Sequence, residues 1–116
     1  MSFLYKLGFR KDKPPKDPNS PKFKRYMANR LHEMHIRYLL ERDSKGEERI
    51  IAREGFIHVS NDELAIICGE KVMFRTIVLE MEAWEFMSLE GATITGFDLD
   101  EGRERTVMAY YKYYRK

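Results

Sequence analysis

Histidines are the first residues of this 116-residue chain whose types could do chemistry. His32 and His35 flank Glu33-Met34, so two imidazoles and a carboxylate lie within four residues. A zinc-protease motif needs its two histidines four residues apart on a helix, so that both reach one metal ion. Here the spacing is three, and no third ligand follows at a recognisable distance. We therefore predict structural or solvent-exposed histidines, no metal and no other cofactor.

Few other residues could support catalysis. His58 lies in a β-forming run, with Glu54 and Arg75 as the nearby polar side chains on the expected strands. Acid–base catalysis needs a partner within hydrogen-bond reach, and no nucleophile occurs at a recognisable spacing. Glycine-rich phosphate loops and the Gly-x-Ser-x-Gly elbow are absent from the sequence. We predict a non-enzymatic protein; an enzyme that uses these three residues is an alternative.

Cys68 and an acidic loop also have structural explanations. Cys68 is the single cysteine and ends an apolar run, where a free thiol is usually a small buried hydrophobic group. A short chain without a cysteine framework is typical of a reducing compartment, so we predict a cytoplasmic protein. Asp98-Leu-Asp-Glu-Gly102 lacks the spaced ligands and distant glutamate of an EF-hand, and a hairpin turn explains it better.

The N-terminal segment carries the main candidate binding residues. Residues 1–45 hold twelve Lys and Arg against five Asp and Glu, whereas residues 46–116 hold nine against fourteen. Apolar side chains beside the cations could rest on an anionic membrane, where each cation contributes on the order of 1 kcal/mol. The alternative is a solubilising terminus. The residues predicted to contact an anionic partner or membrane surface are Lys6, Arg10, Lys11, Lys13 and Lys16.

The C-terminal residues predict a different partner. Tyrosines alternate with cations there, and such a pattern can stack nucleic-acid bases and neutralise phosphates. On a strand, however, successive tyrosines point to opposite faces, so half of them would belong to the core. RNA or single-stranded DNA binding is therefore the alternative function, with Tyr111, Tyr113 and Arg115 as its contact residues.

The chain divides at a proline-rich stretch. All four prolines lie within residues 11–22, which predicts a flexible basic arm over 1–20 and one globular domain over 21–116. Ser20-Pro21 is typical of a helix start. A helix over 21–34 then places four apolar residues on one face: Phe23, Met27, Leu31 and Met34.

From residue 35 the pattern changes to short β-forming runs between turns. Asp43-Ser-Lys-Gly46 predicts a hairpin turn, since glycine accepts the positive φ that such turns require. Residues 77–89 fit both helical and strand periods, and we predict a strand because the neighbouring elements are strands. The other strands are expected over 36–40, 47–53, 56–60, 64–68, 72–76, 92–95 and 105–114. They predict an antiparallel meander.

The segment Glu54-Gly-Phe-Ile-His-Val-Ser-Asn-Asp-Glu-Leu-Ala-Ile-Ile-Cys68 resembles the opening hairpin of pleckstrin-homology and GRAM-type domains, including bacterial ones. The resemblance implies a partly open antiparallel barrel that binds phosphoinositides or protein segments. The chain departs from that family at Asn61-Asp62-Glu63, because phosphoinositide-binding members carry Lys and Arg there. It also ends in a strand where the family has a closing helix.

These observations together predict a mainly β (α+β) domain with an N-terminal helix and a partly open, pleckstrin-homology-like barrel. Its predicted role is non-enzymatic binding, with a protein as the first partner and an anionic membrane surface as the second.

Overall fold

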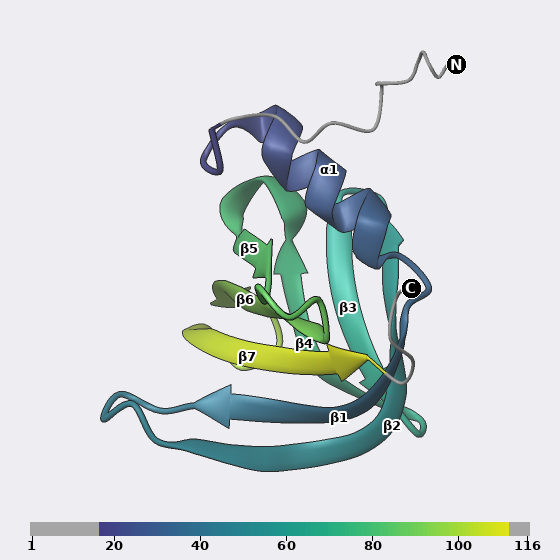
Figure 1. Ribbon diagram of the computed structural model, residues 1–116, viewed down its shortest axis with the longest axis vertical. Coiled ribbons are helices and arrows are strands. Elements are labelled where there is room, and N and C mark those ends of the chain that lie inside the picture. The colour runs from purple at the N-terminus through teal and green to yellow at the C-terminus, as the bar shows by residue number, and fades with distance from the viewer. Residues whose placement is uncertain (1–16, 112–116) are drawn as a thin grey trace.

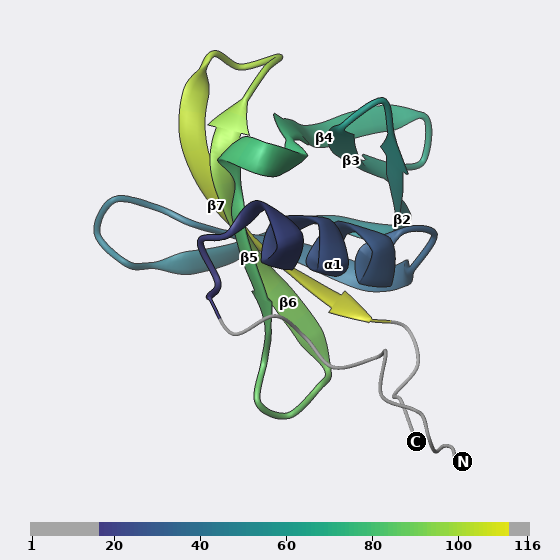
Figure 2. The same ribbon diagram turned by 90° about the horizontal axis from the view of Figure 1, so that it is seen from above.

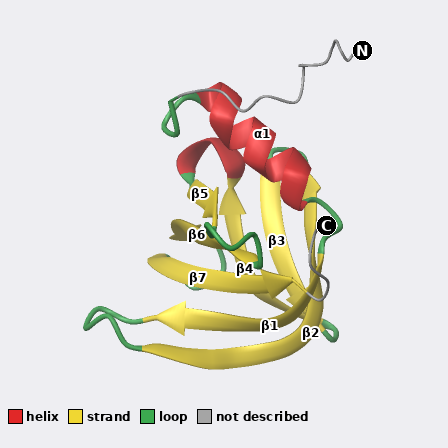
Figure 3. Ribbon diagram, in the orientation of Figure 1, coloured by secondary structure: helices red, strands yellow, loops and turns green. Residues whose placement is uncertain are grey.

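The computed structural model describes residues 17–111. This part of the chain is mainly β, as predicted, with one α-helix and a seven-stranded sheet (Figure 1, Figure 3). The elements in order are α1 (Pro21–Leu31), β1 (His35–Arg42), β2 (Glu48–Ser60), β3 (Glu63–Cys68), β4 (Lys71–Ile77), the 3-10 turn η2 (Val78–Glu80), β5 (Glu82–Glu85), β6 (Gly91–Asp98) and β7 (Arg103–Tyr111).

Helix α1 begins at the predicted residue and ends three residues early. The Ser20 hydroxyl accepts a hydrogen bond from the Phe23 amide at 3.1 Å, which caps the first turn. The helix ends at Leu31 because Glu33 takes a left-handed φ of 63° and its amide donates to the Ile57 carbonyl of β2. Residues 17–20 already form a hydrogen-bonded turn ahead of the helix. The buried helix face consists of Met27, Ala28 and Leu31.

The sheet is antiparallel, with strand order β4-β3-β2-β1-β7-β6-β5. Strands β1 to β4 form one meander and β5 to β7 a second, and the β1–β7 pair joins them. The prediction of one continuous meander is therefore corrected to two. The chain passes from the β4 edge to the β5 edge through η2.

Two strand predictions also need correction. The separate strands expected over 47–53 and 56–60 are one strand, β2, which runs through Glu54 with a φ of 54°. Residues 77–89 form the η2 turn and only a four-residue strand, β5, because the chain must cross between the two sheet edges there. The hairpin turn at Gly46, with a φ of 84°, is confirmed.

The sheet curls on itself without closing, and β4 approaches β6. The Leu99 amide donates to the Arg75 carbonyl at 2.8 Å. A Cβ on Gly96 would lie 2.6 Å from Thr76 Oγ1, so glycine allows β6 to pass close to Thr76 of β4. Helix α1 lies across one open end of the curled sheet (Figure 2), where Arg30 Nε donates to Glu85 Oε1 at 2.6 Å.

The core lies inside the curl, beneath α1. Its largest fully buried side chains include Leu31 from the helix and Phe74, Ile57, Leu64, Ile94 and Val107 from the strands. In the described residues, no helix has the length and apolar character that crossing a membrane requires.

Candidate functional site

The outer face of the sheet carries a largely apolar row that crosses five strands. The row follows directly from the strand register, in which each residue lies opposite the next: Trp84, Thr93, Met108, Leu40 and Ile50. Residues directly opposite one another in a sheet point to the same side. Four spacings of about 4.8 Å make the row roughly 19 Å long.

An aromatic row runs beside it on the same face. The Tyr38 and Tyr110 rings have centroids 4.8 Å apart, and the Phe86 ring meets Tyr110 edge-on at 5.0 Å. Such tilted and edge-on pairs are favourable arrangements of aromatic rings. We call the two rows together the outer apolar face; its residues are Trp84, Thr93, Met108, Leu40, Ile50, Phe86, Tyr110 and Tyr38.

The outer apolar face is separate from the core. The neighbouring residues along the same strands point inward and belong to the core cluster; they are Leu39, Ala83, Ala92, Ile94, Val107 and Ala109. None of the outer residues belongs to that cluster. Met108, in the middle of the row between Thr93 and Leu40, is 2% exposed, whereas Trp84 and Ile50 at the two ends are 45% and 44% exposed. An antiparallel sheet ordinarily presents polar residues on its solvent side, so the sheet here is apolar on both sides.

Charged and hydroxyl groups border this face. Arg42 Nη2 lies 2.8 Å from Glu48 Oε2, and the Thr95 and Thr106 hydroxyls are hydrogen-bonded at 2.9 Å. Burial raises the pKa of Tyr110, and the nearby carboxylates of Glu48 and Glu90 raise it further. The border therefore places the carboxylates of Glu48 and Glu90 close to Tyr110, and the guanidinium-bearing Arg53 directly opposite Tyr38.

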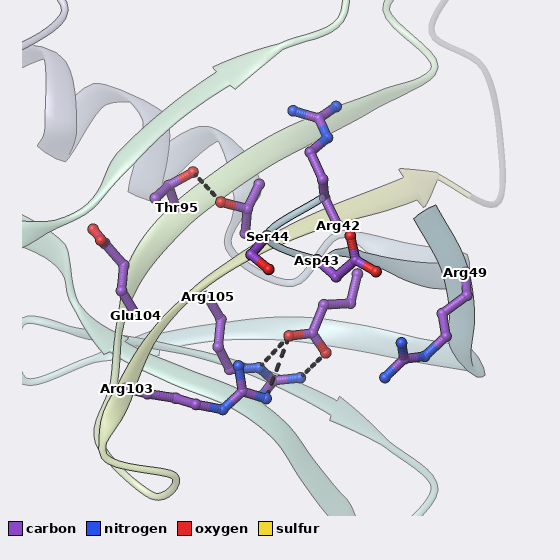
Figure 4. A pocket seen from close by; sticks show the side chains of 10 residues that line it. Arg42, Asp43, Ser44, Arg49, Thr95, Arg103, Glu104 and Arg105 are labelled. Carbon is purple, nitrogen blue, oxygen red and sulfur yellow. Dashed lines mark hydrogen bonds and ion pairs between the residues drawn. The ribbon is translucent and has the colours of Figure 1, made fainter. Parts of the chain in front are cut away.

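A polar hollow of about 400 Å³ opens where β1 and β7 separate, between the β1–β2 and β6–β7 hairpins. Arg105 lies at its base, and its side chain is 4% exposed. The guanidinium binds Glu41 through two hydrogen bonds of 2.8 and 3.0 Å, Asp98 at 2.6 Å and the Met73 carbonyl at 2.7 Å. Figure 4 shows Arg103 beside Arg105, with Arg49 extending from β2 on the opposite wall.

The chemistry of this hollow is that of a fixed ion-pair network. The hydrogen bonds from Arg105 lower the pKa of Glu41, so this carboxylate stays charged, and both of its oxygens accept hydrogen bonds from Arg105. A general base for neutral pH needs a pKa near 7, which this arrangement opposes. The network joins β1, β4, β6 and β7, and its position indicates a role in holding the two meanders together.

The three histidines gather at the other end of β2. The His32 and His58 ring centroids are 5.1 Å apart, and His32 Nδ1 accepts a hydrogen bond from the Val59 amide at 2.9 Å. Because Nδ1 is the acceptor, the proton of the neutral His32 ring lies on Nε2. Within residues 17–111, no three His, Cys, Asp or Glu side chains are arranged to hold a metal ion.

The structure does not bring the three candidate catalytic residues together. His58 and Arg75 both lie opposite Ala65, on strands either side of it, so about 10 Å separates their backbones. Arg75 is already bound to Asp100 at 2.9 Å and Glu63 at 2.8 Å. Glu54 precedes His58 by four residues along β2, which is about 13 Å of strand.

Of the residues predicted to contact a partner, the structure describes only Tyr111. Tyr111 is 2% exposed, and its hydroxyl donates to Glu85 Oε2 at 3.1 Å, so its ring is held inside rather than presented to a base. The other predicted contact residues lie outside the described part of the chain: Lys6, Arg10, Lys11, Lys13, Lys16, Tyr113 and Arg115.

The outer apolar face was not predicted from the sequence, although two of its strands carry a signal for it. Leu39 and Leu40 are adjacent in β1, as are Val107 and Met108 in β7, so both faces of these strands receive apolar side chains. A continuous apolar run in an antiparallel strand indicates that both faces are covered.

Comparisons with protein-family models, curated proteins and solved structures give no significant match to this chain. The resemblance to pleckstrin-homology and GRAM-type domains therefore stays a prediction.

Proposed function

We propose that this chain is a non-catalytic, pleckstrin-homology-like binding domain that takes a protein partner on its outer apolar face. One observation carries the proposal: the solvent side of five paired strands has its own apolar layer, distinct from the core. Exposed apolar patches that are bordered by polar groups are typical of interaction sites. Aromatic residues in such a patch commonly dominate the binding energy.

The polar hollow supports the non-catalytic part of this proposal. Its most buried carboxylate, Glu41, is bound by Arg105, which also binds the buried Asp98. Groups fixed in this way are suited to holding strands in register rather than to exchanging protons with a substrate.

Site-specific photocrosslinking in the cells that produce the protein tests the proposal. Ile50 on the face and Val72 on β4 form a matched pair, because both are β-branched and they are 44% and 43% exposed. A photoreactive residue at 50 should capture a defined protein that the same residue at 72 does not. With that protein purified, Trp84→Ser should weaken binding by at least about tenfold. Equal capture from both positions would refute the proposal.

The basic arm is a second, separate part of the proposed function. Lys6, Arg10, Lys11, Lys13 and Lys16 are proposed to contact an anionic partner or membrane surface. In a co-sedimentation assay with anionic liposomes, the full chain should be found in the pellet with the liposomes. A variant that lacks residues 1–16 should stay in the supernatant. Equal and negligible sedimentation of both proteins would exclude the membrane contact.

A further inference from the structure

The dimensions of the outer apolar face limit what can cover it. Its largely apolar row is about 19 Å long, and the aromatic row lies roughly 7 Å away, two residues along the strands. An α-helix is about 10 Å in diameter and rises 1.5 Å per residue, so roughly 13 helical residues would span the row. A bound strand would instead pair with a sheet edge, because the faces of a sheet offer no free backbone groups.

The area of the face argues against a second copy of the chain. Each of the eight residues in the two rows occupies about 4.8 × 7 Å of the sheet, so the face covers roughly 270 Å². A stable dimer ordinarily buries about 800 Å² on each subunit. A single packed segment fits the smaller area better than another folded domain does.

The charges at the border indicate the composition of that segment. Glu82 lies opposite Thr95 in the row adjacent to Trp84, and Glu90 adjoins the aromatic row next to Gly91. Arg42, which borders the same face, is already paired with Glu48. Acidic groups therefore dominate the β5–β6 end of the face, whereas Arg53 lies opposite Tyr38 at the β2 end. Cations on a partner would complement the carboxylates at the β5–β6 end.

Resting on the proposed function, we infer that the outer apolar face binds an amphipathic α-helix of a partner protein, with an apolar stripe against the two rows and Lys or Arg at its flanks. The helix lies across the strands, from Trp84 towards Ile50. Its apolar residues recur at the three- and four-residue spacings of one helix face.

Selection from a phage-displayed library of random peptides tests the inference, with the full chain as the target. The selected peptides should have apolar residues at the three- and four-residue spacings of one helix face, and they should carry Lys or Arg. The synthesised peptides should shift the emission of Trp84, the only tryptophan, to shorter wavelength as they cover it. Ile50→Lys should weaken their binding at least about tenfold. The matched control Val72→Lys should change it by no more than about twofold.

The other outcomes separate this inference from the proposed function. Peptides whose binding depends on Ile50, but whose apolar residues recur every two residues or whose flanks are acidic, would refute the inferred basic helix. They would still support binding at the outer apolar face. Peptides that bind Ile50→Lys as well as the parent would overturn both. A Trp84 emission shift that follows protein concentration, with a doubled mass in sedimentation, would identify a second copy as the occupant and overturn the inference.

Discussion

Strands β1 and β7 build two opposite environments from neighbouring residues. On the inner side, at the open hollow, they bury charge: Glu41 and Arg105 are 8% and 5% exposed. On the outer side they carry Leu40 and Met108, in a largely apolar row that ends in exposed Trp84 and Ile50. The buried charge is confined to this end of the two strands, because Leu39, Val107 and Ala109 of the same strands point into the apolar core.

The difference separates residues that hold the fold from residues that we propose contact a partner. A buried ion pair is expensive to break, because removal of one partner leaves an unpaired charge away from water. An exposed apolar side chain adds little to the stability of the isolated domain, and its burial is completed only by another molecule. Substitutions on the two sides should therefore have opposite effects on stability and on binding.

Arg105→Met should cause the largest loss of stability. It leaves the Glu41 and Asp98 carboxylates buried without their guanidinium, and such changes cost about 3–5 kcal/mol of unfolding free energy. Urea denaturation measures the loss. Arg75→Met is the matched control, since Arg75 also binds two carboxylates but its side chain is 33% exposed, and its loss should be much smaller. Equal losses would show that burial of the Arg105 network is not what matters.

Gly96→Ala should have the next largest effect. The added methyl group would meet Thr76 Oγ1 at 2.6 Å where β6 passes β4, and overpacking of this kind costs about 1–3 kcal/mol. Thr76→Ala removes the opposing atoms, so the double variant should lose less stability than the two single losses added together. Thermal unfolding of the four proteins gives this coupling, and strict additivity would contradict the contact.

The Glu41 network also predicts a pH dependence. Arg105 lowers the pKa of Glu41 below its usual 4.5, so the folded state is stabilised above that pH. This stabilisation disappears as the pH falls through the lowered pKa and Glu41 takes up a proton. Urea unfolding between about pH 3 and pH 6 should show a steeper loss for the parent than for Glu41→Gln, a change that removes this titration. Identical slopes would mean that other carboxylates govern acid unfolding.

Local patterns in the sequence predict the parts of the fold that depend on nearby residues. Ser20-Pro21 marks the helix start and Gly46 the hairpin, because a cap and a positive φ are local requirements. The β1–β7 pairing joins residues about seventy positions apart, for example Leu39 with Ala109, and no local period specifies it. Without that pairing, Trp84, Met108 and Leu40 cannot be placed in one row, so the outer apolar face was not predictable.

Trp84→Thr should have the smallest effect on stability, and it tests the comparison most directly. Threonine keeps the β propensity of the position, and exposed substitutions usually stay within about 0.5 kcal/mol. Ile94 is the matched inner residue: it lies opposite Ala83, next to Trp84, and is fully buried. Ile94→Ala should cost about 2–5 kcal/mol because it leaves a cavity in the core. Urea denaturation of both variants decides the matter. A loss for Trp84→Thr that approaches that of Ile94→Ala would show that the outer apolar face is a second core of the domain rather than a surface kept for a partner.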